Sequence, residues 1–223
     1  MKRRTSALAV SSAALLLAAP LLAGCSTGSH PGAAAVVGDE RITVSSVQAR
    51  VETVREAQRE QPNGDQLLAS SAGLTRDTVD FLVYQELLEQ TAASHGVEVT
   101  TAQVQQERNL VEASLGSAEE LELSAINGTV GLPLTGEEQI NEVLRRQLLF
   151  QGLATRLGLP AGPEGNQLLA QALSATADEV GVEVNPRYGT WDTEQLVLAD
   201  ADTPWLRQDA PAEEEGLIPQ PPA

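Results

Sequence analysis

The chain has 223 residues, and its 31 acidic side chains against 14 basic ones give a formal net charge of −17. Such a surface repels phosphate, which excludes nucleic acid as a natural partner and makes solubility the simplest interpretation of the charge. Two histidines and one cysteine do not form a metal-ligand set of recognised spacing, and a single cysteine excludes a disulfide within the chain. We therefore expect no metal and no cofactor.

The first 24 residues are typical of a bacterial signal peptide. The basic stretch 2–4 precedes an apolar stretch, 7–22, with three leucines at its centre. This stretch is too short and too rich in small residues to make a comfortable membrane span. Removing residues 1–24 takes away three of the 14 basic side chains and none of the 31 acidic ones, so 11 − 31 leaves a net charge of −20.

The end of the signal peptide has the pattern of a lipoprotein cleavage site. Leu22-Ala23-Gly24-Cys25 places a leucine and two small residues before the only cysteine. We predict cleavage between Gly24 and Cys25 and attachment of a diacylglyceryl group to the Cys25 thiol. Two acyl chains hold a protein on a membrane stably, whereas one binds marginally. Residues 25–33 contain Gly and Pro and no apolar run, so we expect a flexible tether between lipid and domain.

The folded domain is expected over residues 34–207. Residues 34–43 predict a β-hairpin with its turn at Gly38-Asp39. Apolar residues at spacings of three and four, together with capping patterns, predict helices. The expected ranges are 44–61, capped by Thr43; 74–94, with Thr75 as N-cap and Gly96 as left-handed C-cap; 101–115 and 136–157, each starting at a capping box, on Thr100 and Thr135; a weaker one at 118–126; and 166–180.

The end of the domain contains one predicted strand, residues 182–184, followed by a structured turn. Short strands are not stable alone, so we expect this strand to pair with the first hairpin and close the domain. The predicted fold class is therefore α+β and mostly helical, with a small antiparallel sheet. Residues 208–223 are acidic and rich in proline, and are expected to form a disordered tail.

The sequence AAVVGDERITVSSVQARV, residues 34–51, resembles the start of the SurA/PrsA-type chaperone domain. Gly38-Asp39 stands where that family usually has Asn-Gly. The segment VGVEVNPRYGTWD, residues 180–192, is similar to the strand with which these proteins return to the hairpin. The resemblance covers roughly residues 34–192. Many members carry a parvulin prolyl isomerase domain before the returning strand, and the few residues between 159 and the last helix leave no room for it.

The resemblance implies a non-enzymatic chaperone, or holdase, that binds unfolded or newly exported polypeptides. With the lipid on Cys25, it would lie on the outer face of the cytoplasmic membrane, and the composition suggests a high-GC, actinobacterial source. The acidic surface could also attract basic clients. The alternative is a structural or adaptor lipoprotein with one folded envelope partner. The oligomeric state stays open.

No residue of the sequence stands out as catalytic. The carboxylate pairs Glu119-Glu120 and Glu137-Glu138 fall near helix N-termini, where the helix dipole favours acids. His95 falls at a helix C-terminus, where a structural role is expected. Three aromatic residues near the C-terminus are candidates for peptide binding, although packing over the sheet is the simpler interpretation: Tyr188, Trp191 and Trp205.

Overall fold

The computed structural model describes residues 31–129 and 131–200. The signal peptide, the Gly24–Cys25 cleavage site and the 208–223 tail lie outside the described residues. The fold is mostly helical with small antiparallel sheets, as predicted. Its elements are β1 (Ala33–Val37), β2 (Glu40–Thr43), α1 (Val44–Arg59), α2 (Gly64–Ser70), α3 (Leu74–Ser94), α4 (Thr101–Leu115), α5 (Ala118–Ile126), α6 (Gly136–Leu157), α7 (Pro163–Val180), β3 (Val182–Val184), β4 (Thr190–Asp192) and β5 (Val197–Ala199).

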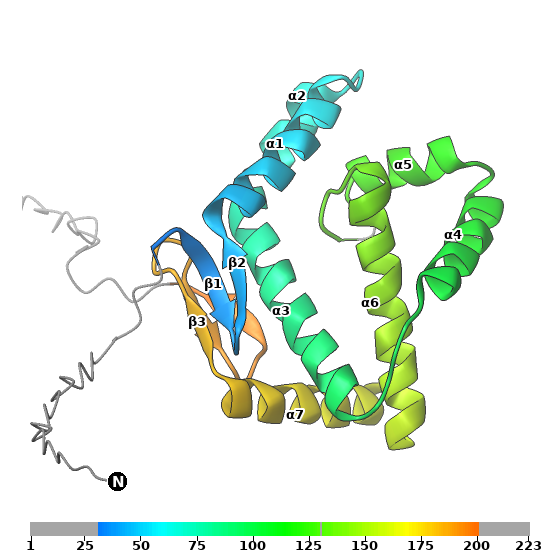
Figure 1. The fold of residues 1–223 in the computed structure, drawn as a ribbon. Helices are drawn as coiled ribbons and strands as arrows, with labels where there is room; N and C mark the ends of the chain where they lie inside the picture. Colours follow the sequence, from blue (N-terminus) through cyan, green and yellow to red (C-terminus); the bar gives the residue numbers. More distant parts are fainter. Residues whose placement is uncertain (1–30, 130, 201–223) are drawn as a thin grey trace, which may run out of the picture.

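The first sheet joins the two ends of the domain, in the strand order β2-β1-β3 (Figure 1). Both pairings are antiparallel, and Val36 lies opposite Arg41 on one side and Glu183 on the other. Gly38 has φ +59° in the predicted turn, and its N–H donates to the Gly181 carbonyl at 3.0 Å. The predicted closure of the domain by the returning strand is confirmed.

Helix α3 is the central helix of the fold, because it contacts α1, α6, α7 and β1 (Figure 1). Val79, Val83 and Leu87 follow one another at four-residue spacing and are buried. The predicted C-terminus is confirmed: Gly96 has φ +68°, and the N–H of Val97 donates to the Ala92 carbonyl at 2.8 Å. This bond is the long one of a Schellman motif.

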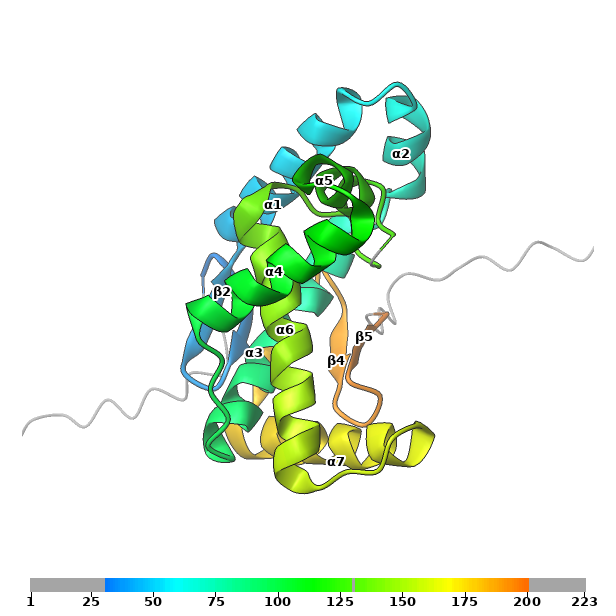
Figure 2. The ribbon, with the colours of Figure 1, turned by 90° about the vertical axis from the view of Figure 1, so that its right-hand side faces the viewer.

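The helix starts are predicted with mixed success. Thr43 caps α1, and the capping box on Thr100 forms at α4, which crosses α6 (Figure 2). At α6 the predicted capping box is absent, because the Thr135 hydroxyl donates instead to Glu122 of α5 at 2.5 Å. The predicted range of α3, 74–94, is confirmed, but its predicted N-cap is wrong, since the helix begins at Leu74 and Thr75 lies inside it.

Three features of the fold go beyond the prediction. Residues 64–70 form the short helix α2, and α7 begins at Pro163 rather than at residue 166. After β3 the chain forms a second hairpin, β4–β5, which packs on α3. None of the helices in the described part of the chain has both the length and the hydrophobicity of a transmembrane segment.

Candidate functional site

A groove of about 960 Å³ lies between α3 and α6, and the α5–α6 loop and the end of α2 also line it. Its walls combine apolar, aromatic and charged side chains. The lining residues are Ser70, Ser71, Leu74, Asp77, Asp80, Phe81, Asn127, Gly128, Gly131, Leu132, Pro133, Leu134, Val143, Arg146, Gln147, Phe150, Gln151 and Ala154.

Helical periodicity explains why these side chains share the groove. On α6 the lining positions are 143, 146, 147, 150, 151 and 154, which form one stripe at spacings of three and four. On α3 the positions 74, 77, 80 and 81 do the same. The buried leucines of α6 lie on both sides of this stripe, because Leu144 is half a turn around the helix axis from Leu153, which is close to Leu149. The groove face of α6 therefore lies between two buried sides of the helix.

One of the lining side chains, Arg146, lies over two aromatic rings. The guanidinium carbon of Arg146 is 5.1 Å from the ring centroid of Phe81 and 4.4 Å from that of Tyr84. The ring of Tyr84 stacks on Phe150, with centroids 6.3 Å apart and planes 6° from parallel. Both phenylalanines of the chain and one of its two tyrosines therefore gather here. Such contacts hold a cation over ring faces and leave apolar surface beside it.

Burial dominates the electrostatics of this site. It lowers the pKa of Arg146, although the nearby Tyr84 and Asp80 act in the opposite direction. Burial also raises the pKa values of Tyr84 and Asp80. No described carboxylate forms an ion pair with Arg146. A charge that is partly removed from water and faces aromatic rings can still gain from a further ring or an acceptor group.

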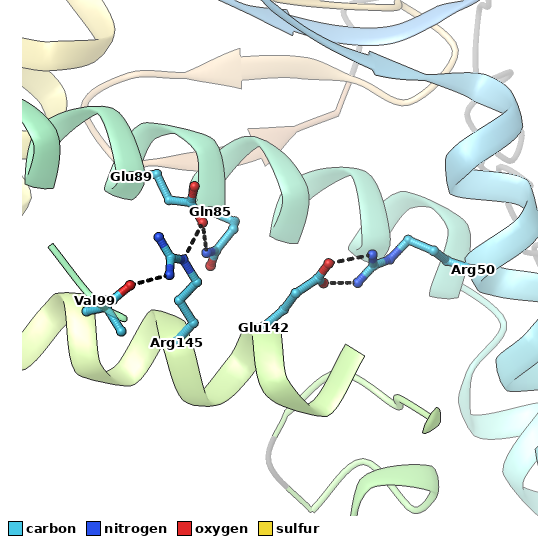
Figure 3. A network of polar contacts seen from close by, with 6 residues as sticks. All are labelled: Arg50, Gln85, Glu89, Val99, Glu142 and Arg145. Atoms are coloured by element: carbon cyan, nitrogen blue, oxygen red, sulfur yellow. Dashed lines mark hydrogen bonds and ion pairs between the residues drawn. The ribbon is translucent and has the colours of Figure 1, made fainter. Parts of the chain in front are cut away.

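Other polar contacts join α6 to α1, to α3 and to the loop between α3 and α4 (Figure 3). Arg50 of α1 makes a two-pronged contact with Glu142 of α6. Arg145 pairs with Glu89 of α3 at 3.3 Å and donates to the Val99 carbonyl at 2.6 Å. Gln85 donates to Glu89 at 2.8 Å. These bridges fix α6 relative to α1 and α3, so they help to hold the groove in shape.

The aromatic residues proposed from the sequence lie elsewhere. Tyr188 and Trp191 are each 9% exposed and belong to the main hydrophobic core. Their burial favours the packing interpretation, and peptide binding by them stays a prediction. Trp205 and Cys25 lie outside the described residues.

The groove residues were missed by the sequence analysis, although part of the signal is visible. Phe81 and Tyr84 are three residues apart, and Arg146 and Phe150 are four apart, so each pair lies on one helix face. The sequence does not show that these two faces meet. That pairing depends on the packing of α3 against α6, which is a tertiary contact.

The side chains that were considered for catalysis, two pairs of glutamates and one histidine, lie at helix ends. Glu119-Glu120 and Glu137-Glu138 lie in the first turns of α5 and α6, as predicted. His95 is the C-cap of α3, and its Nδ1 lies 2.9 Å from the Thr91 carbonyl oxygen. Among residues 31–129 and 131–200, no cluster of three His, Cys, Asp or Glu side chains could hold a metal ion.

Comparison with known proteins places the chain in a family. The model of the SurA-like N-terminal domain matches residues 1–112, which include the α3 wall of the groove but not the α6 wall. No curated protein and no solved structure matches the chain. The match covers just over half of the 223 residues. The chain therefore belongs to the SurA-like N-terminal domain family, whose domain is of a chaperone type and non-catalytic.

Proposed function

We propose that this protein is a membrane-anchored, extracytoplasmic holdase that binds unfolded or newly exported polypeptides in the groove between α3 and α6. The single observation that supports the proposal most is the aromatic and apolar lining of this groove around Arg146. Rings and aliphatic side chains bind exposed apolar segments without reading their sequence. Gln151 adds an amide that can bond an extended backbone, whereas the amide nitrogens of Gln147 and Asn127 already donate to Glu107 and to the Leu123 carbonyl.

The charge of the protein supports the same function. The net charge of −20 that is left after removal of residues 1–24 steers basic polypeptides toward the surface and keeps a protein with bound apolar clients soluble. Binding of this kind is expected to be weak and reversible, because the client loses conformational freedom when it is held. No nucleotide or catalytic step is needed for it.

The test is suppression of aggregation by residues 26–223, measured as light scattering of a chemically unfolded client. We expect dose-dependent suppression by the unaltered protein. Phe150→Ala removes one ring from the groove, and a truncated aromatic contact costs about 1 kcal/mol, or roughly a fivefold loss of affinity. Leu168→Ala, at a 40% exposed position on α7 outside the groove, is the matched control and should suppress aggregation normally.

Circular dichroism should first show that both variants are folded. A folded wild-type protein without any suppressing effect would overturn the holdase proposal and favour the adaptor function. An affinity pull-down that captures one stoichiometric partner would then support the adaptor.

The proposed membrane anchor rests on the sequence around Cys25. A thiol after Leu22-Ala23-Gly24 is the acceptor expected for a diacylglyceryl group, and two acyl chains suffice for stable anchoring. Growth with a clickable palmitate analogue should label the wild-type protein and leave Cys25→Ala unlabelled. Cys25→Ala should also leave the membrane fraction or retain its signal peptide. Equal labelling of both proteins would refute lipidation at Cys25.

A further inference from the structure

The described domain ends at the rim of the groove. In β5, the N–H of Leu198 donates to the Asp80 carboxylate at 2.6 Å, and its carbonyl accepts from Arg76 at 2.6 Å. Arg76 also pairs with Asp200, the last described residue, at 3.2 Å. Asp80 itself lines the groove. The chain is therefore fixed to α3 beside the groove at the point where residues 201–223 begin.

The next few residues can reach into the groove. Trp205 follows Asp200 by five positions, so an extended chain spans roughly 16–18 Å between them. A helix with its side chains is about 10–12 Å wide. Residues 201–205 are thus long enough to cross the rim formed by α3 and to place the Trp205 ring near Arg146.

The chemistry of this segment matches the groove. Trp is the best ring for a cation–π contact, and Arg146 has no described carboxylate as partner. Leu206 adds an aliphatic side chain. Arg207 is the only basic residue in 201–223, and Asp77 and Asp80 are acids of the groove wall. The segment can therefore place an indole ring against Arg146 and a guanidinium group near the two aspartates.

We propose that residues 203–207, with Trp205 and Leu206 as anchors, bind in the groove of the same chain, and that a client must displace them. The consequence for clients rests on the proposed function, whereas the docking does not. A short connection gives an effective concentration on the order of millimolar. Even weak docking then lowers the apparent affinity for a client by roughly 2–10-fold, because the groove is free in only a fraction of the molecules.

Docking is tested without any client by disulfide formation in residues 26–223, which contain no cysteine. Gln151→Cys, at an exposed position of the groove, is combined with Gln208→Cys. In this background, Trp205→Ala with Leu206→Ala should slow the intramolecular crosslink at least about fivefold. Leu217→Ala with Ile218→Ala removes apolar side chains further along, and should leave the rate unchanged. Equal rates in all three proteins, or crosslinks only between molecules, would overturn the proposal.

A second measurement uses the same substitutions without the cysteines. Fluorescence anisotropy of a labelled, unfolded, cationic peptide should show 2–10-fold tighter binding after Trp205→Ala with Leu206→Ala, and no change for the control pair. A crosslink that depends on Trp205 and Leu206, together with no peptide binding by any variant, would support docking and refute the holdase function. Equal peptide binding by all variants, together with equal crosslink rates, would support the holdase function and refute docking.

Discussion

At the scale of single residues, Gly189 shows how one position without a side chain can fix a hairpin. It has φ +131°, a region that is essentially restricted to glycine. A Cβ added there would lie 2.3 Å from the Ala199 carbonyl oxygen in β5. The backbone just before β4 thus approaches β5 more closely than any side chain at this position allows. Gly96 also has a positive φ, +68°, but a Cβ there would meet nothing within 4 Å.

These two glycines give a matched pair of substitutions. Gly96→Ala should cost about 1 kcal/mol, because only the left-handed conformation is penalised. Gly189→Ala adds a clash with backbone and should cost about 2–4 kcal/mol in the free energy of unfolding. Urea denaturation followed by circular dichroism measures both values. Equal losses for the two variants would show that the β4–β5 hairpin adjusts without strain.

At the scale of elements, local signals predicted most of the helices and the first sheet. The capping box at Thr100 and the Schellman motif at Gly96 need only neighbouring residues, so the sequence contains all the information. The prediction of a capping box at Thr135 was wrong because a residue of another helix takes part. Glu122, from the preceding helix, bonds both the Thr135 hydroxyl and the Gly136 N–H. A competing partner from another element is not visible in local spacing.

The β4–β5 hairpin was missed for a similar reason. Its strands have three residues each, too short for a clear alternating pattern. Their position depends on Arg76 of α3, which donates to the Tyr188 carbonyl at 3.0 Å and to the Leu198 carbonyl at 2.6 Å. A guanidinium with several donors can hold two segments of backbone at once. The groove was missed because it exists only where α3, α6 and the α5–α6 loop meet.

At the scale of the whole molecule, the excess of acidic residues affects stability as well as solubility. Like charges repel in the compact state, and lowering the pH toward the sequence pI of about 4.4 reduces this repulsion. Two half-buried carboxyl groups also make the folded state more stable at lower pH. Burial raises the pKa of Asp80, and it also raises the pKa of Glu86, where the neighbouring Glu89 and Glu40 contribute.

The sign of the pH dependence follows from these directions. A carboxyl whose pKa is higher in the folded than in the unfolded state binds its proton more readily when folded. Its contribution to stability is complete below the unfolded values of about 3.8 for Asp80 and 4.5 for Glu86, and is lost as the pH rises through the raised values. The free energy of unfolding should therefore increase as the pH falls from about 7 to about 5.

Asp80→Asn separates the local effect from the global one. The amide oxygen can still accept from the Leu198 N–H, so the contact to β5 is kept while the charge is removed. We expect this variant to gain less stability than the wild type between about pH 7 and about pH 5, with the difference between them largest at the higher pH. Thermal unfolding at several pH values and about 0.15 M salt measures this. Parallel curves for the two proteins would assign the pH dependence to net charge alone, and a wild-type curve that falls on acidification would contradict both causes.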